Sequence, residues 1–391
     1  MVTRRKRLNE SGVGLYVHLP FCKSKCRYCD FNSYAWTGQS LQTYVNALLV
    51  EAEQRTQDLK PQTVFFGGGT PTFLPADLLS QLLDELNRIC GFCTSSLETT
   101  MEANPESVTE ERVLAIQAGG VNRLSIGIQS LQADVLQAYD RVHSPNQARE
   151  ALALAQQHFP NFSADLIFAF PGQDPERWRL DLAEVLNYAP KHISCYELSY
   201  EPGTALTRLR DVGRWNAEDP DLCEHLFIKT GEQCSAAGFQ RYEISNFCQP
   251  DHQCLHNLAA WQSLDFIGIG AGAASSMAGT RRHNIERPDA YQAAIEAGDD
   301  PISREERPNA ETVLFEHMLM GMRLTQQGVS RQRALRQTRL DPWDEYRSQL
   351  SELVQQGLIQ ASEDQDQICA TPRGTLLLDH ILMQFLPSAS V

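Results

Sequence analysis

The stretch that decides the fold reads Tyr16-Val17-His18-Leu19-Pro20-Phe21-Cys22-Lys23-Ser24-Lys25-Cys26-Arg27-Tyr28-Cys29-Asp30-Phe31. Its three cysteines follow the spacing C-x3-C-x2-C and come directly after the apolar run 15–19, which predicts a buried strand. The thiols therefore fall on the loop that leaves the carboxyl end of a strand. That is where α/β folds keep their chemistry.

Three cysteine ligands are too few for a closed zinc site, which takes four. They suit a [4Fe–4S] cluster in which one iron has no protein ligand and stays open for another molecule. The spacing resembles the signature of the radical S-adenosylmethionine (SAM) superfamily. The resemblance implies that SAM binds the open iron through its amino and carboxylate groups, and that one-electron reduction then gives a 5′-deoxyadenosyl radical. The weaker alternative is a set of unrelated buried cysteines, or a zinc site completed elsewhere in the chain.

Length and charge set limits on the class of protein. The chain has 391 residues, more than the roughly 250–300 at which a single core stops growing, so a large domain and a smaller one are expected. The 34 Lys and Arg against 49 Asp and Glu leave a formal charge of −15, which disfavours nucleic acid as a partner. No apolar stretch reaches the roughly 18 residues of a membrane span, and no signal-like segment follows the start, so we expect a cytoplasmic protein.

The basic run at residues 4–7 is interpreted as a solvated tail, with peripheral contact to an anionic lipid surface as the alternative. Eleven cysteines are scattered along the chain without framework spacing, which fits a reducing compartment. Cys90 and Cys93 form a C-x2-C pair, and Cys248 and Cys254 flank a turn. A small zinc site is only a minor alternative, because neither pair has a convincing partner pair.

Strands and helices alternate through the first half of the chain. Strands are predicted at 15–19, 63–66, 98–102, 123–128, 162–168 and 192–198, and helices at 41–59, 75–90, 109–118, around Val135, and at 145–158. Short turns between them indicate a parallel sheet covered by helices. We therefore predict an α/β fold with a partial (β/α)6, TIM-like barrel, whose core spans residues 14–200 after a tail at 1–13.

The second half is expected to complete the barrel and to add a small α+β module. Residues 201–297 carry a predicted helix at 219–237, a strand near 242–244 and a small-residue run at 268–273, and a linker is predicted at 298–310. Beyond it we predict helices at 311–323, 341–355 and 374–385, and a hairpin of 358–359 with 367–370. Helices followed by a short hairpin resemble a winged-helix module (311–391). We interpret it as a lid or docking domain, with a DNA-binding role as the weaker alternative.

Polar residues at predicted strand ends indicate a ligand site at the barrel mouth. Glu102, Gln129 and Asp165 each end a strand, where side chains point into the mouth of a barrel. A carboxylate accepts ribose hydroxyls, Arg141 can hold a carboxylate bidentately, and the Gly-rich run 67–72 offers unobstructed backbone groups. Any one of these alone would more readily cap a helix or form a surface ion pair.

Together, residues 16–22, the run 67–72, Gln129, Arg141, Asp165 and the closing module resemble the oxygen-independent coproporphyrinogen III oxidase (HemN) family over nearly the whole chain. The resemblance implies a [4Fe–4S] cluster and two bound SAM molecules. The matching positions are Cys22, Cys26 and Cys29 for the cluster, Tyr16, Gly68 and Glu102 for the cluster-bound SAM, and Tyr28, Gly69, Thr70, Gln129, Arg141 and Asp165 for the second SAM. Ser199 and Ala274 fall near further SAM contact positions.

Two departures favour the HemW branch of this family over the oxidases. The oxidases carry a fourth cysteine where this chain has Phe31, and a longer arm before the first strand, whereas only fifteen residues precede Tyr16. HemW-type proteins are implicated as haem chaperones and carry an H-N-x-x-Y-W motif. Residues 256–261 match it except at Ala260. A neutral His256 would ligate haem iron, and Trp261 would stack on the macrocycle.

The first hypothesis is therefore a haem-binding and transfer protein on a radical SAM scaffold. Its partners would be haem and haem-accepting respiratory proteins, with a homodimer as one assembly that the cluster would support. The second hypothesis is a true coproporphyrinogen III oxidase, which converts propionates to vinyl groups by radical abstraction and decarboxylation. The third is a zinc-stabilised winged-helix regulator.

Overall fold

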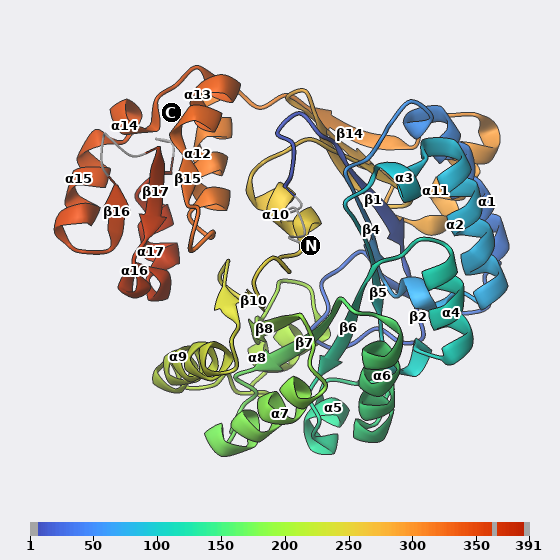
Figure 1. Cartoon of the computed structure of the whole chain (residues 1–391), viewed down its shortest axis with the longest axis horizontal. Coiled ribbons are helices and arrows are strands. Elements are labelled where there is room, and N and C mark those ends of the chain that lie inside the picture. The colour runs from blue at the N-terminus through green and yellow to red at the C-terminus, as the bar shows by residue number, and fades with distance from the viewer. Residues whose placement is uncertain (1–6, 362–365, 387–391) are drawn as a thin grey trace, which may run out of the picture.

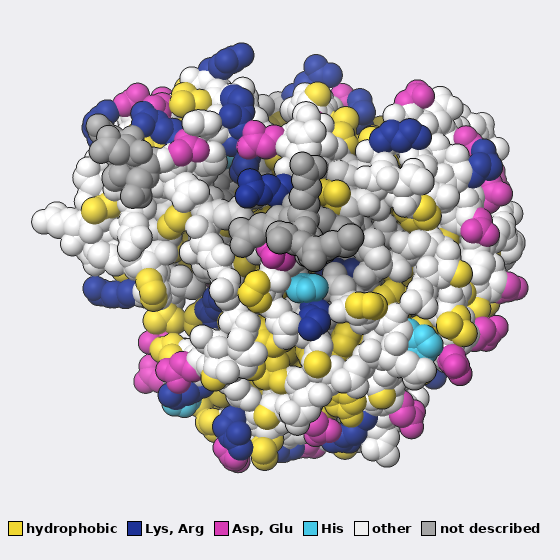
Figure 2. Space-filling model, in the orientation of Figure 1, with side chains coloured by type: hydrophobic (Ala, Val, Ile, Leu, Met, Phe, Trp, Pro, Cys, Tyr) yellow, Lys and Arg dark blue, Asp and Glu magenta, His cyan; other side chains and the backbone are white. Residues whose placement is uncertain are grey.

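The computed structural model describes residues 7–361 and 366–386. Most of them form one curved mixed sheet flanked by helices, with a smaller module at one side (Figure 1). The strand order in the large sheet is β14-β13-β12-β11-β1-β4-β5-β6-β7-β8-β10-β9. Acidic and basic side chains are interspersed over the described part of the face in Figure 2. Three residues of the predicted basic run, 4–6, lie outside the described residues.

The six predicted parallel strands are confirmed. They are β1 (Gly14–Leu19), β4 (Thr63–Gly68), β5 (Glu98–Ala103), β6 (Arg123–Gln129), β7 (Phe162–Phe168) and β8 (His192–Glu197). Each pairs in parallel with the next along the chain, which is the arrangement of a partial (β/α)6 barrel. All six carboxyl ends therefore meet at one mouth of the barrel.

Helices follow the strands as expected, and three of the helices in this part of the chain form where we predict none. The barrel helices are α1 (Leu41–Thr56), α2 (Ala76–Cys90), α3 (Phe92–Ser95), α4 (Glu110–Ala118), α5 (Ala133–Ala138), α6 (Pro145–His158), α7 (Pro175–Asn187), α8 (Ala205–Asp211) and α9 (Pro220–Ala236). The unpredicted helices are α3, α7 and α8. Short elements lie at the mouth: β2 (Phe21–Cys22), β3 (Tyr34–Ala35) and the 3-10 turns η1 (Pro71–Phe73) and η2 (Pro105–Ser107).

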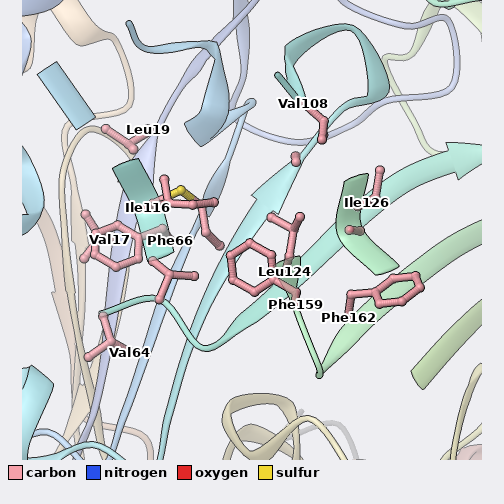
Figure 3. Packing of buried hydrophobic residues seen from close by; sticks show 14 of the residues in the cluster. Val17, Leu19, Val64, Phe66, Val108, Ile116, Leu124, Ile126, Phe159 and Phe162 are labelled. Carbon is pink, nitrogen blue, oxygen red and sulfur yellow. The ribbon is translucent and has the colours of Figure 1, made fainter. Parts of the chain in front are cut away.

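The main core lies between the outer face of the sheet and these helices. Figure 3 shows apolar side chains of β1, β4 and β6, such as Val17, Phe66 and Leu124, packed together with Ile116 of α4. The leucines of α2 recur at helical spacing (78, 79, 82, 83 and 86) and are buried. Burial of this stripe fixes the helices on the sheet and so holds the strand ends in register.

One edge of the sheet extends further than predicted. β11 (Phe266–Ile269) pairs in parallel with β1. The sheet then continues with antiparallel pairing through β12 (Ala274–Met277), β13 (Thr280–Asn284) and β14 (Ile302–Glu306). Helix α11 (Pro288–Ala297) lies in the chain between β13 and β14. The predicted linker at 298–310 is therefore wrong for residues 302–306. Their charged side chains are those of an exposed edge strand, which in sequence look like a linker.

At the other edge, the predicted strand near 242–244 is wrong. These residues form the turn between β9 (Gln240–Arg241) and β10 (Asn246–Cys248), which pair antiparallel, and β10 pairs with β8. The Tyr242 amide donates to the Asn246 carbonyl at 3.1 Å and closes the turn.

The C-terminal module combines helices with a three-stranded sheet of order β15-β17-β16. The elements are α12 (Ala310–Gly321), β15 (Val329–Ser330), α13 (Arg331–Thr338), α14 (Pro342–Glu345), α15 (Arg347–Gln355), β16 (Ile359–Ala361), β17 (Gln367–Ala370), α16 (Pro372–Leu376) and α17 (Leu378–Met383). The predicted hairpin is confirmed as β16 with β17. Two predicted helices are each split in two, at Tyr346 and at Leu377, and α13 and β15 were not predicted.

Helix α10 (Leu255–Trp261) lies between the barrel and this module (Figure 1). The Arg323 guanidinium of the module lies 5.8 Å from the centre of the Trp261 ring, and the Thr325 amide donates to the Tyr242 carbonyl at 3.1 Å. The module therefore contacts both α10 and the β9–β10 turn.

A buried carboxylate, Glu51 of α1, joins α1 to the loop after β11 and to α11. It is inaccessible to solvent and accepts hydrogen bonds from the Gly270 amide at 2.8 Å, the Tyr291 hydroxyl at 2.6 Å, Asn284 Nδ2 at 2.7 Å and Arg55 Nη1 at 2.6 Å. Removing it would leave the Gly270 amide and the Tyr291 hydroxyl without their acceptor and the Arg55 guanidinium without its ion-pair partner.

We predict that Glu51→Ala lowers the free energy of unfolding by roughly 3–5 kcal/mol, because it breaks a buried ion pair and its hydrogen bonds. Urea unfolding followed by circular dichroism measures this. Glu53→Ala is the matched control, since its ion pair with Arg88 is exposed and its loss should change stability little. Equal effects of the two substitutions would contradict the role given to Glu51.

Candidate functional site

The three cysteines of the opening stretch lie together at the mouth of the barrel, and a donor group approaches each sulfur. Thr70 Oγ1 donates to Cys22 Sγ at 3.5 Å, Arg141 Nη1 donates to Cys26 Sγ at 3.5 Å, and Ser33 Oγ lies 3.6 Å from Cys29 Sγ. Donors of this kind stabilise thiolate ligands and tune a bound cluster.

Protonation of the metal-free thiols follows from their burial. Burial raises the pKa of Cys22 to about 11, opposed by the hydrogen bond from Thr70, and it also raises the pKa of Cys29. Binding of a cation must therefore drive the release of protons from this loop. Three thiols in one loop, with donors positioned on their sulfurs, fit a four-iron cluster in which each cysteine holds a different iron.

The cysteines open into a cavity of about 380 Å³, the cluster cavity. It is lined by all three cysteines and by Tyr28, Gly68, Gly69, Glu102, Gln129, Arg141, Asp165 and Ser199, among others. The structure thus brings together every residue predicted for the second SAM except Thr70, which contacts Cys22 instead. Gln129 has a φ of 64°, a backbone conformation that side-chain-bearing residues seldom adopt, at the end of β6.

Arg141 is saturated by protein partners. Its Nη2 donates to Asn104 Oδ1 at 2.8 Å and to the Gly127 carbonyl at 2.7 Å, Nη1 reaches Cys26 and the Tyr28 hydroxyl, and Nε reaches His143 Nδ1 at 3.4 Å. Its five N–H groups are thereby used. The predicted bidentate hold on a ligand carboxylate is not what this arrangement shows; the guanidinium instead joins the cysteine loop to β6.

Asp165 of β7 has nearly exhausted its capacity to accept hydrogen bonds. Ser125 and Ser163 each donate to it at 3.0 Å, and Ser194 donates at 2.6 Å. Burial raises its pKa, and these three hydroxyls oppose the rise. A carboxylate has about four acceptor positions, so Asp165 has room for about one more donor.

Glu102 of β5 differs, since among the residues that the structure describes only the Gly68 amide donates to it, at 3.3 Å. Burial, and next the nearby charge of Asp165, raise the pKa of Glu102 to about 7. Glu102 also lines a second cavity, so its carboxyl group stands at the boundary between the two.

This second cavity, the His256 cavity, measures about 480 Å³ and lies between β1, β4, β11 and α10. It is lined by Tyr16, Gly68, Glu102 and Ala274, all predicted for SAM, and by His256, together with His18, Phe31, Asn32 and Phe65. The two cavities share Phe31, Gly68 and Glu102. The predicted SAM residues thus divide between two adjoining spaces.

Sequence reasoning missed His18 as a site residue. The Tyr16 hydroxyl donates to His18 Nδ1 at 2.9 Å, because His18 Nε2–H is taken by the Asn32 carbonyl, also at 2.9 Å. His18 therefore joins β1 to the residues after the cluster loop. The alternation of strand residues could have found it, since it places Tyr16 and His18 on the same inner face of β1.

His256 lies on α10 and is half-buried, with its ring stacked on that of Phe65 at 5.2 Å between ring centres. Burial lowers the pKa of His256 to about 4, so the imidazole is neutral at pH 7. Nδ1 lies 3.0 Å from Thr63 Oγ1, and Nε2 has no hydrogen-bond partner among the described residues. A neutral imidazole with one free nitrogen is a competent ligand for iron.

Helix α10 is held by Glu98, the first residue of β5. Its carboxylate accepts from the amides of Leu255 at 3.0 Å and His256 at 3.2 Å, and from Cys254 Sγ at 3.5 Å. Trp261, at the other end of the helix, is not among the described residues that line the His256 cavity and faces Arg323 instead. The predicted stacking of Trp261 on a macrocycle held by His256 has no support in this arrangement.

The alternative zinc site also lacks support. Cys90 Sγ and Cys93 Sγ donate to the carbonyls of Leu86 and Gly119 respectively. Within residues 7–361 and 366–386, no three His, Cys, Asp or Glu side chains form a group that would hold a single metal ion. A four-iron cluster does not require such a group, because its cysteines bind separate irons.

A partial (β/α)6 barrel with three cysteines at its mouth defines the class of protein. The family model for the radical SAM superfamily matches residues 16–184, and the model for the HemN C-terminal domain matches residues 309–377. Coproporphyrinogen III oxidase (HemN) from Escherichia coli has a similar fold, with a TM-score of 0.79 over 96% of this chain and 90% of that one at 22% identity. The protein is a radical SAM protein, a family that implies a [4Fe–4S] cluster and SAM.

Relatives of known name narrow the assignment. The heme chaperone HemW of Bacillus subtilis is 33% identical over 95% of this chain and 98% of its own length. That of Escherichia coli is 33% identical over 96% and 98%. A mouse protein, radical S-adenosyl methionine domain-containing protein 1, mitochondrial, is 34% identical over 96% and 87%. The chain belongs to the HemW family.

We predict that replacing Cys22, Cys26 and Cys29 together by serine abolishes cluster assembly, because hydroxyls are poor iron ligands here. Iron and acid-labile sulfide per chain, measured after anaerobic reconstitution, should fall close to zero. Cys93→Ser is the matched control, since Cys93 is exposed and far along the chain. Full iron content in the triple variant would refute the assignment of the ligands.

A second prediction concerns Glu102. Its pKa of about 7 in the fold exceeds the ordinary value of 4.5, so the folded protein binds more protons than the unfolded chain between these pH values. Stability should therefore fall as pH rises from about 4.5 to 7, by roughly 3 kcal/mol or less.

Glu102→Gln should remove this contribution. The difference in urea unfolding free energy between pH 5 and pH 8 should then be smaller in the variant than in the unaltered protein, both without cofactors. Glu53→Gln, at an exposed site, serves as the control. Parallel pH profiles for all three proteins would show that Glu102 titrates normally.

Proposed function

We propose that this protein is a haem chaperone, which binds haem through His256 and passes it to acceptor proteins. The observation that carries the proposal is the half-buried, neutral imidazole of His256 with a free Nε2 on the wall of a cavity of about 480 Å³. Membership of the HemW family, whose bacterial members are named heme chaperones, supports it.

In this proposal, neighbouring residues fix the orientation of the His256 imidazole that binds the haem iron. Thr63 Oγ1 engages Nδ1 and fixes the ring orientation, while Glu98 fixes the helix that carries the ring. Phe65 and Tyr16, whose ring centres lie 6.3 Å apart, provide an apolar wall for a planar ligand. Because burial keeps the imidazole neutral, no proton has to leave before iron binds.

The cofactor sites follow from the same geometry. Cys22, Cys26 and Cys29 would hold the cluster, and the residues of the two cavities would hold SAM. When bound, a [4Fe–4S] cluster of this class supplies one electron to SAM at its open iron. Arg141 and Thr70 stabilise the thiolates, and Glu102 offers a carboxylate for ribose hydroxyls.

The partners would be haem and haem-accepting respiratory proteins, and we infer a cytoplasmic location. All eleven cysteines are free thiols, which supports a reducing compartment. Among the described residues, no helix has the length and apolar character needed to cross a membrane. Contact between two copies of the chain through the exposed aromatics Phe31 and Trp36 is the assembly we would test first.

The proposal predicts that His256→Ala weakens haem binding on the order of 10–100-fold or more, because the iron loses its axial ligand. Titration of the protein with haem, followed by the Soret band, measures the dissociation constant. His252→Ala is the matched control, since His252 lies four residues earlier and lines a separate cavity. Identical titrations for the unaltered protein and His256→Ala would rule out this ligand.

The same preparation separates a chaperone from an oxidase. Reconstituted protein supplied with SAM, a reductant and coproporphyrinogen III should form no protoporphyrinogen. Robust turnover would overturn the chaperone proposal.

A further inference from the structure

Residues assigned to haem and residues assigned to SAM line the same His256 cavity. Its wall includes His256, the proposed haem ligand, and also Tyr16, Gly68 and Glu102. Glu102 and Gly68 line the cluster cavity as well. A ligand that extends from the cysteines past Glu102 therefore enters the space in front of His256.

The hydrogen-bonding needs of the SAM ribose favour a pose that extends into the space in front of His256. Its ribose needs a carboxylate with free acceptor positions, and the two cavities offer Glu102 and Asp165. Asp165 already accepts from three hydroxyls, whereas within residues 7–361 and 366–386 Glu102 accepts only from the Gly68 amide. Glu102 is thus the better acceptor for a ribose, and it stands on the boundary of the His256 cavity.

The aromatic side chains of the cavity offer a packing surface for haem or for the adenine of SAM, and one ligand would exclude the other. The rings of His256, Phe65 and Tyr16 form one compact cluster, with 5.2 Å between the centres of His256 and Phe65, 6.3 Å between Phe65 and Tyr16, and 6.5 Å between His256 and Tyr16. An adenine that packs on Tyr16 and a macrocycle bonded to His256 would occupy the same space. At about 480 Å³, the cavity is in the lower half of the roughly 300–1,000 Å³ range of sites for a single small molecule.

The cavity also has little freedom to expand. Helix α10, which closes it, is held at its start by three hydrogen bonds to Glu98. Just past its end, Gln262 Nε2 donates to Gln327 Oε1 of the C-terminal module at 2.6 Å, and Trp261 faces Arg323. Outward movement of α10 to admit a second ligand would break these contacts.

We propose that haem bound to His256 and SAM bound at the cluster are alternative occupants of the His256 cavity, so that SAM releases haem. The inference rests on the proposed function, because it takes His256 as the haem ligand. Because the two ligands exclude one another, each raises the apparent dissociation constant of the other in proportion to its own concentration. Supply of SAM to the loaded chaperone then becomes a signal for haem delivery.

The test is a Soret titration of cluster-reconstituted protein with haem at increasing fixed concentrations of SAM, under anaerobic conditions and without reductant so that SAM stays intact. Direct competition raises the apparent haem dissociation constant linearly, by a factor of about 11 when SAM is at ten times its own dissociation constant. An apparent constant that is unchanged by SAM, or that reaches a plateau, would overturn the proposal, because a plateau signifies that both ligands bind together. Free haem mixed with SAM controls for direct reaction between the two.

His256→Ala distinguishes the failure of this inference from the failure of the proposed function. If the substitution leaves haem binding without SAM unchanged, the ligand assignment fails and the inference with it. If it weakens haem binding while SAM has no effect on the unaltered protein, only the competition is refuted. Isothermal titration of SAM into protein at increasing haem concentrations gives the reciprocal measurement, in which the apparent SAM dissociation constant should also rise linearly without a plateau.

Discussion

The site depends on a backbone contact between the end of β1 and the glycine run that follows β4. The Gly69 amide donates to the Leu19 carbonyl at 2.8 Å, and the Thr70 amide donates to the Phe21 carbonyl at 2.9 Å. A Cβ atom at Gly69 would lie 2.7 Å from backbone atoms of Pro20 and Phe21, a separation that no side chain tolerates. Only glycine lets the two segments approach, and this approach brings Thr70 onto Cys22 and the cysteine loop over the barrel mouth.

Much of this arrangement follows from local signals in the sequence. Apolar runs with short turns locate the six parallel strands, and polar residues at their ends, such as Glu102 and Gln129, must then meet at one mouth because parallel strands end on the same side. The cysteine spacing predicts the cluster ligands for a similar reason, since all three lie in one loop. Site residues that lie at the end of a strand can therefore be predicted from the sequence.

What was missed depends on partners far apart in the chain. The saturation of Arg141 requires Cys26, Asn104 and Gly127 at once, and no local pattern announces it. The edge strand β14 looks like a linker in the sequence because its side chains are charged, as is typical of a strand at an exposed sheet edge. Trp261 lies five residues from His256, and the turn of the helix, together with the module that covers it, carries its ring away from the cavity.

Phe31, two residues after the last cysteine of the loop, is 61% exposed although it borders both cavities. Of the aromatics in the cysteine loop, it gives the metal centre the least cover. A cluster held by Cys22, Cys26 and Cys29 would lie in the cavity that this exposed residue borders, within reach of dioxygen. Protein isolated in air should consequently lose its iron–sulfur cluster and its colour. Measurements on such preparations would then describe the protein without its cluster.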